Sequence, residues 1–376
     1  MTPRDGQVLP EAEWVYQRLK AFTGKSCISP NFKLKSLFVN SKEIKQVFNR
    51  FNGMNIVIIG DVMVDSYMWG RVDRISPEAP IPIVSANKRE DRPGGAANVA
   101  LNVQALGANP ILCSVTGDDT HRQLFLELME EKRLDSSGIL ADSNRRTTVK
   151  TRIISGNQQL IRVDEEVNDK IDRPTEKKLI ELIRRLLCSE KIDAVIFEDY
   201  DKGVITPSLI GEVRDITADR GILLTADPKK RNFGHYKNLD LFTPNLKELS
   251  EGLRMDIERT DLEGIEGGAR KLQEANNIRY LLVTLSERGI YLRHDGEGTV
   301  VPTEVRDVAD VSGAGDTVIA VATACLAAGC SARNMTMVAN LAGGQVIEKV
   351  GVIPVNKEHL LQETLALFAR RSHANL

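Results

Sequence analysis

The sequence predicts an α/β protein in which a mostly parallel sheet lies between two layers of helices. Short apolar runs alternate with segments of helical periodicity from Pro174 to the C-terminus, which is the pattern of a three-layer domain. Several of these runs end in charged or amide residues, as central parallel strands do at a binding crevice. Other stretches alternate apolar and polar residues around prolines and do not fit that sheet, so they predict a small β lid outside it.

The composition excludes several classes of function. The 376 residues include 50 lysines and arginines against 52 aspartates and glutamates, and the net charge of -2 is spread without a long block of one sign. We therefore expect no nucleic-acid or membrane-surface partner and a small-molecule substrate. The five cysteines contain no C-x-x-C pair, and the longest apolar stretch, 318–328, is too short to span a bilayer. These features favour a cytoplasmic protein with reduced thiols.

Two parts of the chain differ in how regular their pattern of apolar and polar residues is. Residues 1–40 show only a short amphipathic pattern broken by prolines, and we expect a peripheral or disordered extension. Regular organisation follows and predicts one domain over 41–376. A helix is expected over 42–51, and the apolar run 55–59, which ends at Gly60-Asp61, predicts the first central strand.

The lid is predicted from strands drawn from about residues 66–90 and 145–165. Prolines between and within the first two strands exclude a central position, so exposed antiparallel strands are expected. Such a lid leaves an unpaired strand edge that self-association would cover, and we expect a homodimer formed through it. The four lid strands are predicted over 67–72, 81–86, 147–154 and 159–163.

The remaining elements follow the alternation of strands and helices. Residues 260–263, with the sequence Thr-Asp-Leu-Glu, have the spacing of a capping box and predict a helix that begins at Thr260. The glycine pair Gly94-Gly95 is expected to open a helix that continues to Leu106. The other predicted elements are helices over 174–188 and 206–218, strands over 194–197, 222–226, 239–243, 281–285 and 290–293, a helix around Leu246, and three helices after Gly313.

The stretch 310–317, with the sequence Asp-Val-Ser-Gly-Ala-Gly-Asp-Thr, is the strongest candidate for chemistry. It opens a proline-free apolar run that predicts a buried helix, so Gly313, Ala314 and Gly315 would lie on its first turn. Their unpaired amides and the positive end of the helix dipole would hold an anion. Asp316 follows at once and would take a hydroxyl proton, as phosphoryl transfer requires. The alternative is a glycine-softened turn before a core helix.

Polar residues at the predicted strand ends are expected to meet Asp316. Asp61, residues 198–203, 227–229 and 244–248 each follow an apolar strand, and the carboxyl ends of parallel strands share one edge of a sheet. Solvated loops are the alternative for each segment taken alone. Their number at one edge favours a binding crevice.

Three glycine-containing patterns also resemble parts of binding sites. Asn98 follows Gly94-Gly95 and offers donors and acceptors that suit the hydroxyls of a sugar, although the glycines equally fit close helix packing. Gly24-Lys25-Ser26 lacks the first glycine of a P-loop, and Gly313-x-Gly315 lacks the third glycine of a dinucleotide fingerprint. Neither of these nucleotide-binding motifs is present.

Three motifs in this order resemble the ribokinase, or PfkB, family of sugar kinases: residues 94–98, Asn245-x-x-Glu248 and residues 310–317. The likeness extends from about residue 41 to the C-terminus and implies a ribokinase-like fold with ATP and Mg²⁺ as cofactors. It implies Asp316 as the base and the amides of Gly313, Ala314 and Gly315 as the anion hole. The implied sugar-binding residues are Asp61, Gly94, Gly95, Asn98 and Lys202. The implied nucleotide-binding residues are Asn245, Glu248, Ser286, Gly289 and Asn340, with Glu248 reaching the metal indirectly through water.

Within this family, further segments resemble the kinases that phosphorylate the anomeric hydroxyl of D-glycero-β-D-manno-heptose 7-phosphate on the route to ADP-heptose for the lipopolysaccharide core. These segments are 60–65, 74–82, 199–203 and 340–351. In many such relatives the kinase is fused to a nucleotidyltransferase that carries an H-x-G-H motif. The motif does not occur in this sequence, so the resemblance implies that a separate chain provides the second activity.

A sugar that already carries a phosphate calls for a cation in the site. Lys202 is the first candidate, and Arg92, Arg152 and Arg162 compete with it. Asp201, where the family pattern has a small residue, and Glu198 add negative charge beside Lys202, which weakens its assignment.

Two other functions remain open. A kinase of the same fold for another sugar or a nucleoside would keep Asp316 without a cation cluster under the lid. A non-catalytic sugar-binding protein would keep the lid and lose the base, and the presence of Asp316 argues against it.

Overall fold

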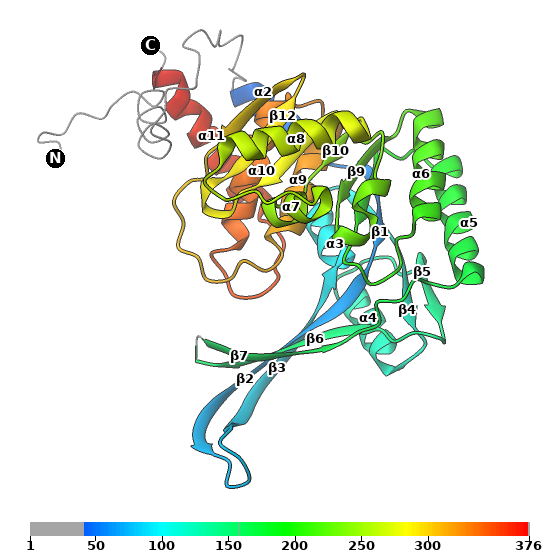
Figure 1. Cartoon of the computed structure of the whole chain (residues 1–376), viewed down its shortest axis with the longest axis vertical. Helices are drawn as coiled ribbons and strands as arrows, with labels where there is room; N and C mark the ends of the chain where they lie inside the picture. The colour runs from blue at the N-terminus through cyan, green and yellow to red at the C-terminus, as the bar shows by residue number, and fades with distance from the viewer. Residues whose placement is uncertain (1–40, 157, 375–376) are drawn as a thin grey trace, which may run out of the picture.

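A nine-stranded sheet forms the centre of the domain (Figure 1). The computed structural model describes residues 41–156 and 158–374, and the predicted extension 1–40 lies outside this part. The sheet order is β13-β12-β11-β10-β9-β8-β1-β4-β5, and every neighbouring pair is parallel except β11–β12 and β12–β13. The mostly parallel sheet is therefore confirmed. Its strands are β1 (Asn55–Gly60), β4 (Asn109–Gly117), β5 (Ile139–Asp142), β8 (Ala194–Glu198), β9 (Leu223–Asp227), β10 (Leu241–Phe242), β11 (Tyr280–Thr284), β12 (Ile290–His294) and β13 (Glu297–Val301).

Two hydrophobic cores lie on opposite faces of the sheet, and successive residues of β1 belong to them in turn. Ile56 and Ile58 belong to one core, and Val57 and Ile59 belong to the other, because successive side chains of a strand point to opposite faces. Helices α2, α3, α4, α9, α10 and α11 contribute to the first core, and α5 to α8 contribute to the second, which confirms the three layers. The bounds are α2 (Ser41–Arg50), α3 (Ala96–Ala105), α4 (Thr120–Glu131), α5 (Arg173–Ser189), α6 (Pro207–Arg220), α7 (Leu246–Leu253), α8 (Leu262–Asn276), α9 (Ala314–Ala327), α10 (Ala332–Val346) and α11 (Lys357–Ala374). None of the helices in the described part is long and apolar enough to cross a membrane.

The lid is a separate four-stranded sheet in the order β3-β2-β6-β7. Strand β2 pairs with β3 in antiparallel fashion but with β6 in parallel, so the expectation of antiparallel strands alone was wrong. The connection from β3 to β6 passes through α3, β4, α4 and β5, which is long enough for a parallel return. The strands are β2 (Val62–Ile75), β3 (Pro82–Gly95), β6 (Thr148–Ser155) and β7 (Gln158–Glu165).

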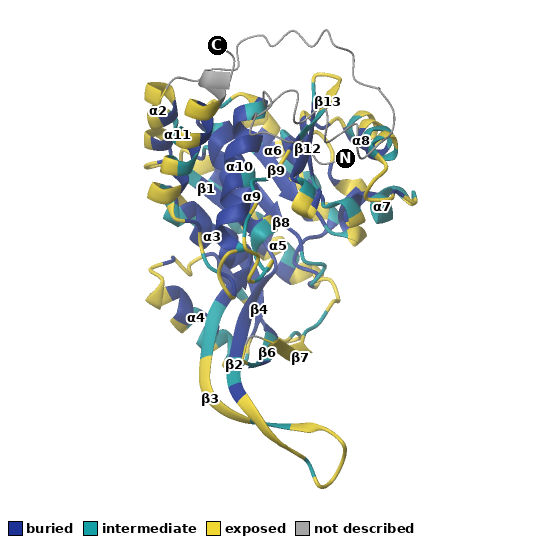
Figure 2. Cartoon of the chain, turned by 90° about the vertical axis from the view of Figure 1, so that its left-hand side faces the viewer, coloured by how far each residue is buried: buried dark blue, intermediate teal, exposed yellow. Residues whose placement is uncertain are grey.

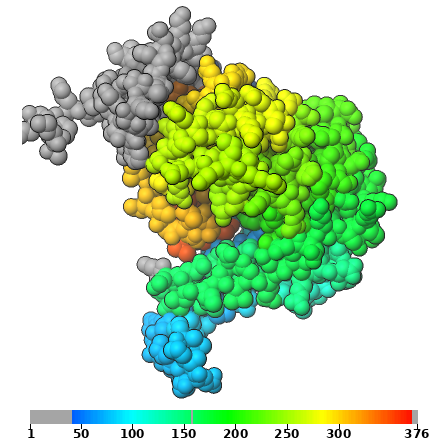
Figure 3. Space-filling view, viewed as in Figure 1, coloured from blue at the N-terminus to red at the C-terminus, as the bar shows by residue number. Residues whose placement is uncertain are grey.

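The β2–β3 hairpin is longer than the predicted strands 67–72 and 81–86. The first residues of β2 and the last of β3 are buried, whereas the far end of the hairpin is exposed and projects away from the body (Figures 2 and 3). The buried root shows no alternation of apolar and polar residues, since the domain covers it on both faces. The pattern in the sequence therefore revealed only the exposed part.

Other predicted boundaries also changed. Helix α3 begins at Ala96, because Gly94 and Gly95 still belong to β3. The N-cap of α8 is Asp261, whose side chain accepts the amide of Gly264, so the capping box predicted from Thr260 was wrong by one residue. Strands β4, β5 and β13 and helix α4 had no predicted counterpart.

Candidate active site

Helix α9 begins at Ala314, with Gly313 as its N-cap in the left-handed region at φ 79°. A Cβ at Gly313 would lie 2.8 Å from Nδ2 of Asn98, so both the backbone conformation and the approach of α3 require glycine here. No side chain of the described residues caps this helix end. The first-turn amides therefore lie where the sequence predicted them, and their role toward an anion stays a prediction.

Asp316 lies on this first turn and is 3% exposed. Its Oδ2 accepts a hydrogen bond from Nδ2 of Asn98 at 2.7 Å, and its Oδ1 accepts one from the hydroxyl of Tyr200 at 2.7 Å. Burial raises the pKa of Asp316 above its usual range, and the two hydrogen bonds act in the opposite direction. A buried carboxylate that is oriented through both oxygens suits the role of a general base.

A second buried amide positions Asn98. Asn102 lies one turn further along α3 and donates from Nδ2 to the carbonyl oxygen of Asn98 at 2.9 Å. Its Oδ1 accepts from the hydroxyl of Thr317 at 3.2 Å and from the amide of Val355 at 3.0 Å. Asn102 thus ties α3 to α9 and to the segment before α11, and the sequence had given no sign of this role.

Two strand ends bring further carboxylates to Asp316. Glu198 ends β8 and Asp227 ends β9, and one oxygen from each of the three side chains lies within 4.8 Å of the others. All three residues are buried. Burial raises the pKa of Glu198 and of Asp227 well above the usual ranges, and the negative charge of Asp227 adds to the effect on Glu198. The predicted convergence at this edge of the sheet is confirmed.

Lys229 provides positive charge beside these carboxylates. Its Nζ lies 2.5 Å from Oε1 of Glu248 and 5.3 Å from the ring centroid of Tyr200. Burial lowers the pKa of Lys229, but Asp227 and Glu248 outweigh it and raise the pKa above its usual range. We call Glu198, Asp227, Glu248, Asp316 and Lys229 the sheet-edge cluster. Sequence reasoning noticed the segment 227–229 but assigned no role to Lys229.

Asn245 and Glu248 form a capping box at the start of α7. The side chain of Asn245 accepts the amide of Glu248 at 2.9 Å, and Oε2 of Glu248 accepts the amide of Asn245 at 2.8 Å. The N-x-x-E spacing therefore fixes both side chains at the carboxyl edge, as a capping box does. Their roles toward nucleotide and magnesium stay predictions.

Asp61 follows β1 and is buried. Its Oδ2 accepts the amides of Tyr200 and Lys202 at 2.9 and 3.0 Å, and its Oδ1 accepts the amide of Val204 at 3.0 Å. Asp61 therefore holds the loop after β8, and this loop carries the hydroxyl of Tyr200 to Asp316. The predicted contact of Asp61 with a sugar stays a prediction.

Lys202 lies where the lid joins the domain. Its Nζ is 2.8 Å from Oε1 of Glu166 and 3.0 Å from Oδ1 of Asn168. Glu166 and Asp164 also pair with Lys150, at 3.0 and 3.1 Å. We call Lys150, Lys202, Asp164 and Glu166 the lid-root cluster. The three competing cations are paired too: Arg152 with Asp65, Arg162 with Asp164, and Arg92 with Glu90.

The other predicted site residues shape turns and loop contacts. A Cβ at Gly94 would lie 1.9 Å from Oδ2 of Asp65, and one at Gly95 would lie 2.4 Å from the carbonyl oxygen of Asp61, so close packing requires both glycines. Ser286 and Gly289, with φ of 54° and 94°, form the turn between β11 and β12. Asn340 of α10 donates to the carbonyl oxygen of Pro302 at 2.9 Å. The nucleotide roles of Ser286, Gly289 and Asn340 stay predictions.

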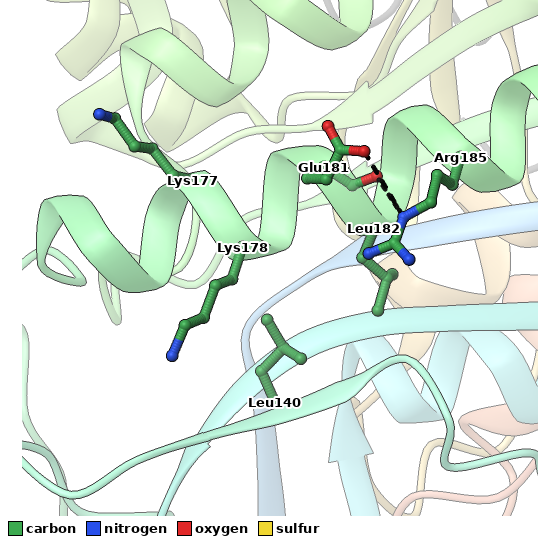
Figure 4. Close-up of a pocket in the computed structure, with 6 residues that line it drawn as sticks. All are labelled: Leu140, Lys177, Lys178, Glu181, Leu182 and Arg185. Carbon is green, nitrogen blue, oxygen red and sulfur yellow. Dashed lines mark hydrogen bonds and ion pairs between the residues drawn. The ribbon is translucent and has the colours of Figure 1, made fainter.

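A separate surface hollow of about 430 Å³ lies beside α5 (Figure 4). Leu182 of α5 and Leu140 of β5 face each other there, and Arg185 pairs with Glu181 along the helix. Lys177 and Lys178 complete the lining. None of these residues belongs to the strand ends or loops around Asp316, so the hollow is not part of the candidate site.

Comparison with known proteins matches residues 54–359 to the pfkB family carbohydrate kinases. The bifunctional protein HldE of Helicobacter pylori strain HPAG1 is 37% identical over 321 residues, which are 85% of this chain and 67% of the relative. The same protein of Geotalea uraniireducens strain Rf4 is 37% identical over 323 residues, 86% of this chain and 65% of the relative. The chain thus spans about two thirds of the length of these relatives.

Solved structures share the fold at low sequence identity. Phosphofructokinase-2 from Escherichia coli in complex with fructose-6-phosphate has a TM-score of 0.69 at 16% identity, covering 85% of this chain and 100% of that one. Ribokinase from Arabidopsis thaliana complexed with ribose and ATP has a TM-score of 0.64 at 19% identity, covering 83% and 99%. Together with the family match, they agree with a ribokinase-like fold. The chain belongs to the pfkB family of carbohydrate kinases and is an ATP-dependent sugar kinase.

Proposed function

We propose that this chain transfers the γ-phosphoryl group of ATP to the anomeric hydroxyl of D-glycero-β-D-manno-heptose 7-phosphate. The product would be the 1,7-bisphosphate on the route to ADP-heptose for the lipopolysaccharide core. The segments 60–65 and 199–203 support this substrate through their resemblance to heptose kinases. The relatives named bifunctional protein HldE, of which the chain spans about two thirds, support the same assignment.

The position of Asp316 is the main support for the kinase mechanism. Its carboxylate stands on the first turn of α9 and is held by Asn98 and Tyr200. The anomeric hydroxyl would give its proton to this carboxylate while its oxygen attacks the γ-phosphorus, and the bond from phosphorus to the ADP oxygen would break. The amides of Gly313 to Gly315 would neutralise the charge that develops on the transferred group.

The residues present fit a magnesium ion. Glu198 and Asp227 offer carboxylate oxygens close to each other at one edge of the sheet, and Glu248 lies beside them against Lys229. Mg²⁺ prefers oxygen ligands and retains several waters. When bound with ATP, Mg²⁺ would neutralise charge on the β- and γ-phosphates. The resemblance implies that Glu248 would hold it through water. The capping box with Asn245 fixes the Glu248 side chain at this edge, and its Oε1 lies against Lys229.

The phosphate that the sugar already carries would lie at the lid-root cluster. Of the two lysines in this cluster, Lys202 lies on the loop that also carries Tyr200. Asp61 holds this loop by accepting the amides of both residues. The 7-phosphate would replace Glu166 as the partner of Lys202. The phosphate carries two negative charges and the carboxylate carries one, so the lysine would gain a stronger charge-assisted contact.

A coupled ADP-release assay over a panel of acceptors tests this function. Heptose 7-phosphate, the free heptose, fructose 6-phosphate, ribose and adenosine should be compared at equal concentration, with the Asp316→Asn variant as the blank. We expect heptose 7-phosphate to give the highest kcat/KM. Equal turnover of a free hexose or of adenosine would leave the family-level kinase activity and remove the heptose assignment.

We also propose a homodimer formed through the lid. Strand β7 is exposed along its whole length, including Ile161 and Val163, and it ends the lid sheet opposite β3. An exposed apolar edge strand favours pairing with a second copy. Light scattering should give a dimer for the wild-type chain and a monomer for Ile161→Lys, whereas a wild-type monomer at micromolar concentration would contradict the proposal.

A further inference from the structure

Two cysteines meet at the C-terminal end of α9. Cys325 is buried in the last turn of the helix, and Cys330 follows the helix and is partly buried. The amide of Cys330 donates to the carbonyl oxygen of Cys325 at 3.0 Å, and the amide of Gly329, at φ 81°, donates to that of Leu326 at 3.0 Å. These two bonds form a Schellman motif, which brings the side chains on either side of the turn into contact.

The thiols of Cys325 and Cys330 touch each other. The thiol of Cys325 donates a hydrogen bond to the sulfur of Cys330. The backbone hydrogen bond between the two residues also keeps their Cα atoms at the short separation that a disulfide spans. Both cysteines are free in the structure. The pair is therefore a reduced dithiol that can close to a disulfide without a large movement of the backbone.

Cys330 is the more reactive thiol of the pair. The hydrogen bond from Cys325 lowers the pKa of Cys330 below its usual range, burial opposes this effect, and the positive charge of Arg50 adds to it. Arg50, at the end of α2, donates to the carbonyl oxygen of Ala328 at 2.8 Å, which holds its guanidinium group at the turn. A partly exposed thiol beside an arginine is the usual setting of a reactive cysteine.

We propose that Cys330 is a site of reversible oxidation by hydrogen peroxide and that Cys325 converts the product to an intramolecular disulfide. The Cys330 thiolate attacks one oxygen of the peroxide, the O–O bond breaks, and the leaving hydroxide takes up a proton to become water. The sulfur of Cys325 then attacks the sulfur of the Cys330 sulfenic acid, and the S–O bond breaks with release of a second water. The two thiols lose two electrons and two protons, and the peroxide is reduced to water.

The disulfide protects Cys330 from irreversible damage. A sulfenic acid that condenses with a neighbouring thiol does not go on to sulfinic acid, and a thiol reductant restores the pair. The pair lies at the opposite end of α9 from Asp316. This modification site is therefore separate from the candidate active site and does not depend on which sugar the kinase phosphorylates.

Peptide mapping of the folded full chain tests the site. The reduced protein is treated with hydrogen peroxide, alkylated with iodoacetamide in denaturant and digested with trypsin. The digestion leaves both cysteines in the single peptide 307–333 and Cys188 in the peptide 186–191. In the wild type, we expect peptide 307–333 to lose both alkylation sites and two hydrogens before Cys188 reacts. Dithiothreitol should restore both alkylation sites.

Three variants separate the roles of the thiols. Cys325→Ser leaves Cys330 without a second thiol, so dimedone should trap a sulfenic acid on peptide 307–333 that the wild type does not accumulate. Cys330→Ser should leave Cys325 fully alkylatable, because the attacking thiol is absent. Cys188→Ser is the matched control, since it removes an exposed thiol elsewhere and should form the disulfide as the wild type does. Thermal unfolding in the presence of reductant checks the fold of each variant.

Two results would overturn the proposal. One is a wild-type peptide 307–333 that keeps both alkylatable cysteines at a peroxide concentration that oxidises Cys188, which would show that the pair is only the packing contact of the turn. The other is a wild type in which Cys330 accumulates as sulfenic or sulfinic acid while Cys325 stays alkylatable. Both results come from the wild-type chain without ATP or sugar, so they depend neither on the folding of a variant nor on the heptose assignment.

Discussion

The sheet-edge cluster and the lid-root cluster use charge in opposite ways. In the lid-root cluster, Lys202 and Lys150 both meet carboxylates, so the charges are balanced within the protein. In the sheet-edge cluster, buried carboxylates crowd around Lys229, and Glu198 has no hydrogen-bond partner in the described part of the chain. The charges of the lid-root cluster are paired with one another, whereas the sheet-edge cluster has four carboxylates and one lysine. In the Lys202–Glu166 pair, an anion of a ligand can take the place of the carboxylate. Glu198 has no hydrogen-bond partner that a ligand would have to displace.

One loop connects the two clusters. Asp61 holds the amides of Tyr200 and Lys202, which lie two residues apart. The side chain of Tyr200 reaches Asp316, while that of Lys202 reaches Glu166. A sugar bound between them would therefore have its reacting hydroxyl at one cluster and its phosphate at the other.

The largest expected effect comes from removing the base of the sheet-edge cluster. Asp316→Asn should lower kcat by about 10² to 10⁴, the usual contribution of a positioned general base. ATP binding should persist, because the first-turn amides of α9 are unchanged. Steady-state kinetics and ATP titration measure the two quantities, and near-normal turnover would remove Asp316 from the mechanism.

The second-largest effect is expected from Lys202→Ala, which tests whether the lid-root cluster binds the phosphate of the sugar. Lys202→Ala should weaken heptose 7-phosphate by about 10-fold to 150-fold, through loss of a charge-assisted contact of about 1.5 to 3 kcal/mol. The free heptose and ATP should change little. Arg162→Ala is the comparison variant, because Arg162 is half exposed and pairs with Asp164.

The two sugars distinguish a contact from a structural role. If both weaken equally in Lys202→Ala, the side chain supports the loop after β8 rather than binding the phosphate. The phosphate contact would then lie at Arg92, Arg152 or Arg162. The first two of these lie over the ring of Tyr67.

The smallest effect concerns the anion that the phosphate would replace. Burial raises the pKa of Glu166, but hydrogen bonds from Lys202 and Lys150 outweigh it and hold the pKa below its usual range, so the carboxylate is ionised at neutral pH. Glu166→Gln removes this competitor and should tighten heptose 7-phosphate by up to about five-fold, since ion pairs of this kind are worth about 0.2 to 1 kcal/mol. Weaker binding in KM measurements would show instead that Glu166 orients Lys202.

The sequence was informative where a single physical rule placed a residue. Asp316 was predicted because a glycine-rich turn opened an apolar helix, and the meeting with Glu198 and Asp227 was predicted because parallel strands end at one edge. Close packing at Gly94 and Gly95 was one of two predicted alternatives. These inferences needed only periodicity and strand direction.

Residues whose side chains depend on loop conformation could not be placed in this way. Tyr200 reaches Asp316 because Asp61 accepts the amide of Tyr200 and because Asp201 adopts a left-handed conformation at φ 56°. No local sequence pattern predicts this loop conformation. Asn245 and Glu248 have the spacing of a capping box, which the structure contains, although only their nucleotide role was predicted. The buried root of the β2–β3 hairpin was missed because residues covered on both faces do not alternate.

Phosphorus NMR of the reaction mixture tests the central claim most directly. With ATP, Mg²⁺ and heptose 7-phosphate, the wild-type chain should produce ADP together with a new phosphate signal coupled to the anomeric proton, while the 7-phosphate signal persists. The Asp316→Asn variant should produce neither at a comparable rate. ADP formation without an anomeric phosphate, or an anomeric phosphate formed equally fast by Asp316→Asn, would contradict phosphoryl transfer to this hydroxyl at the sheet-edge cluster.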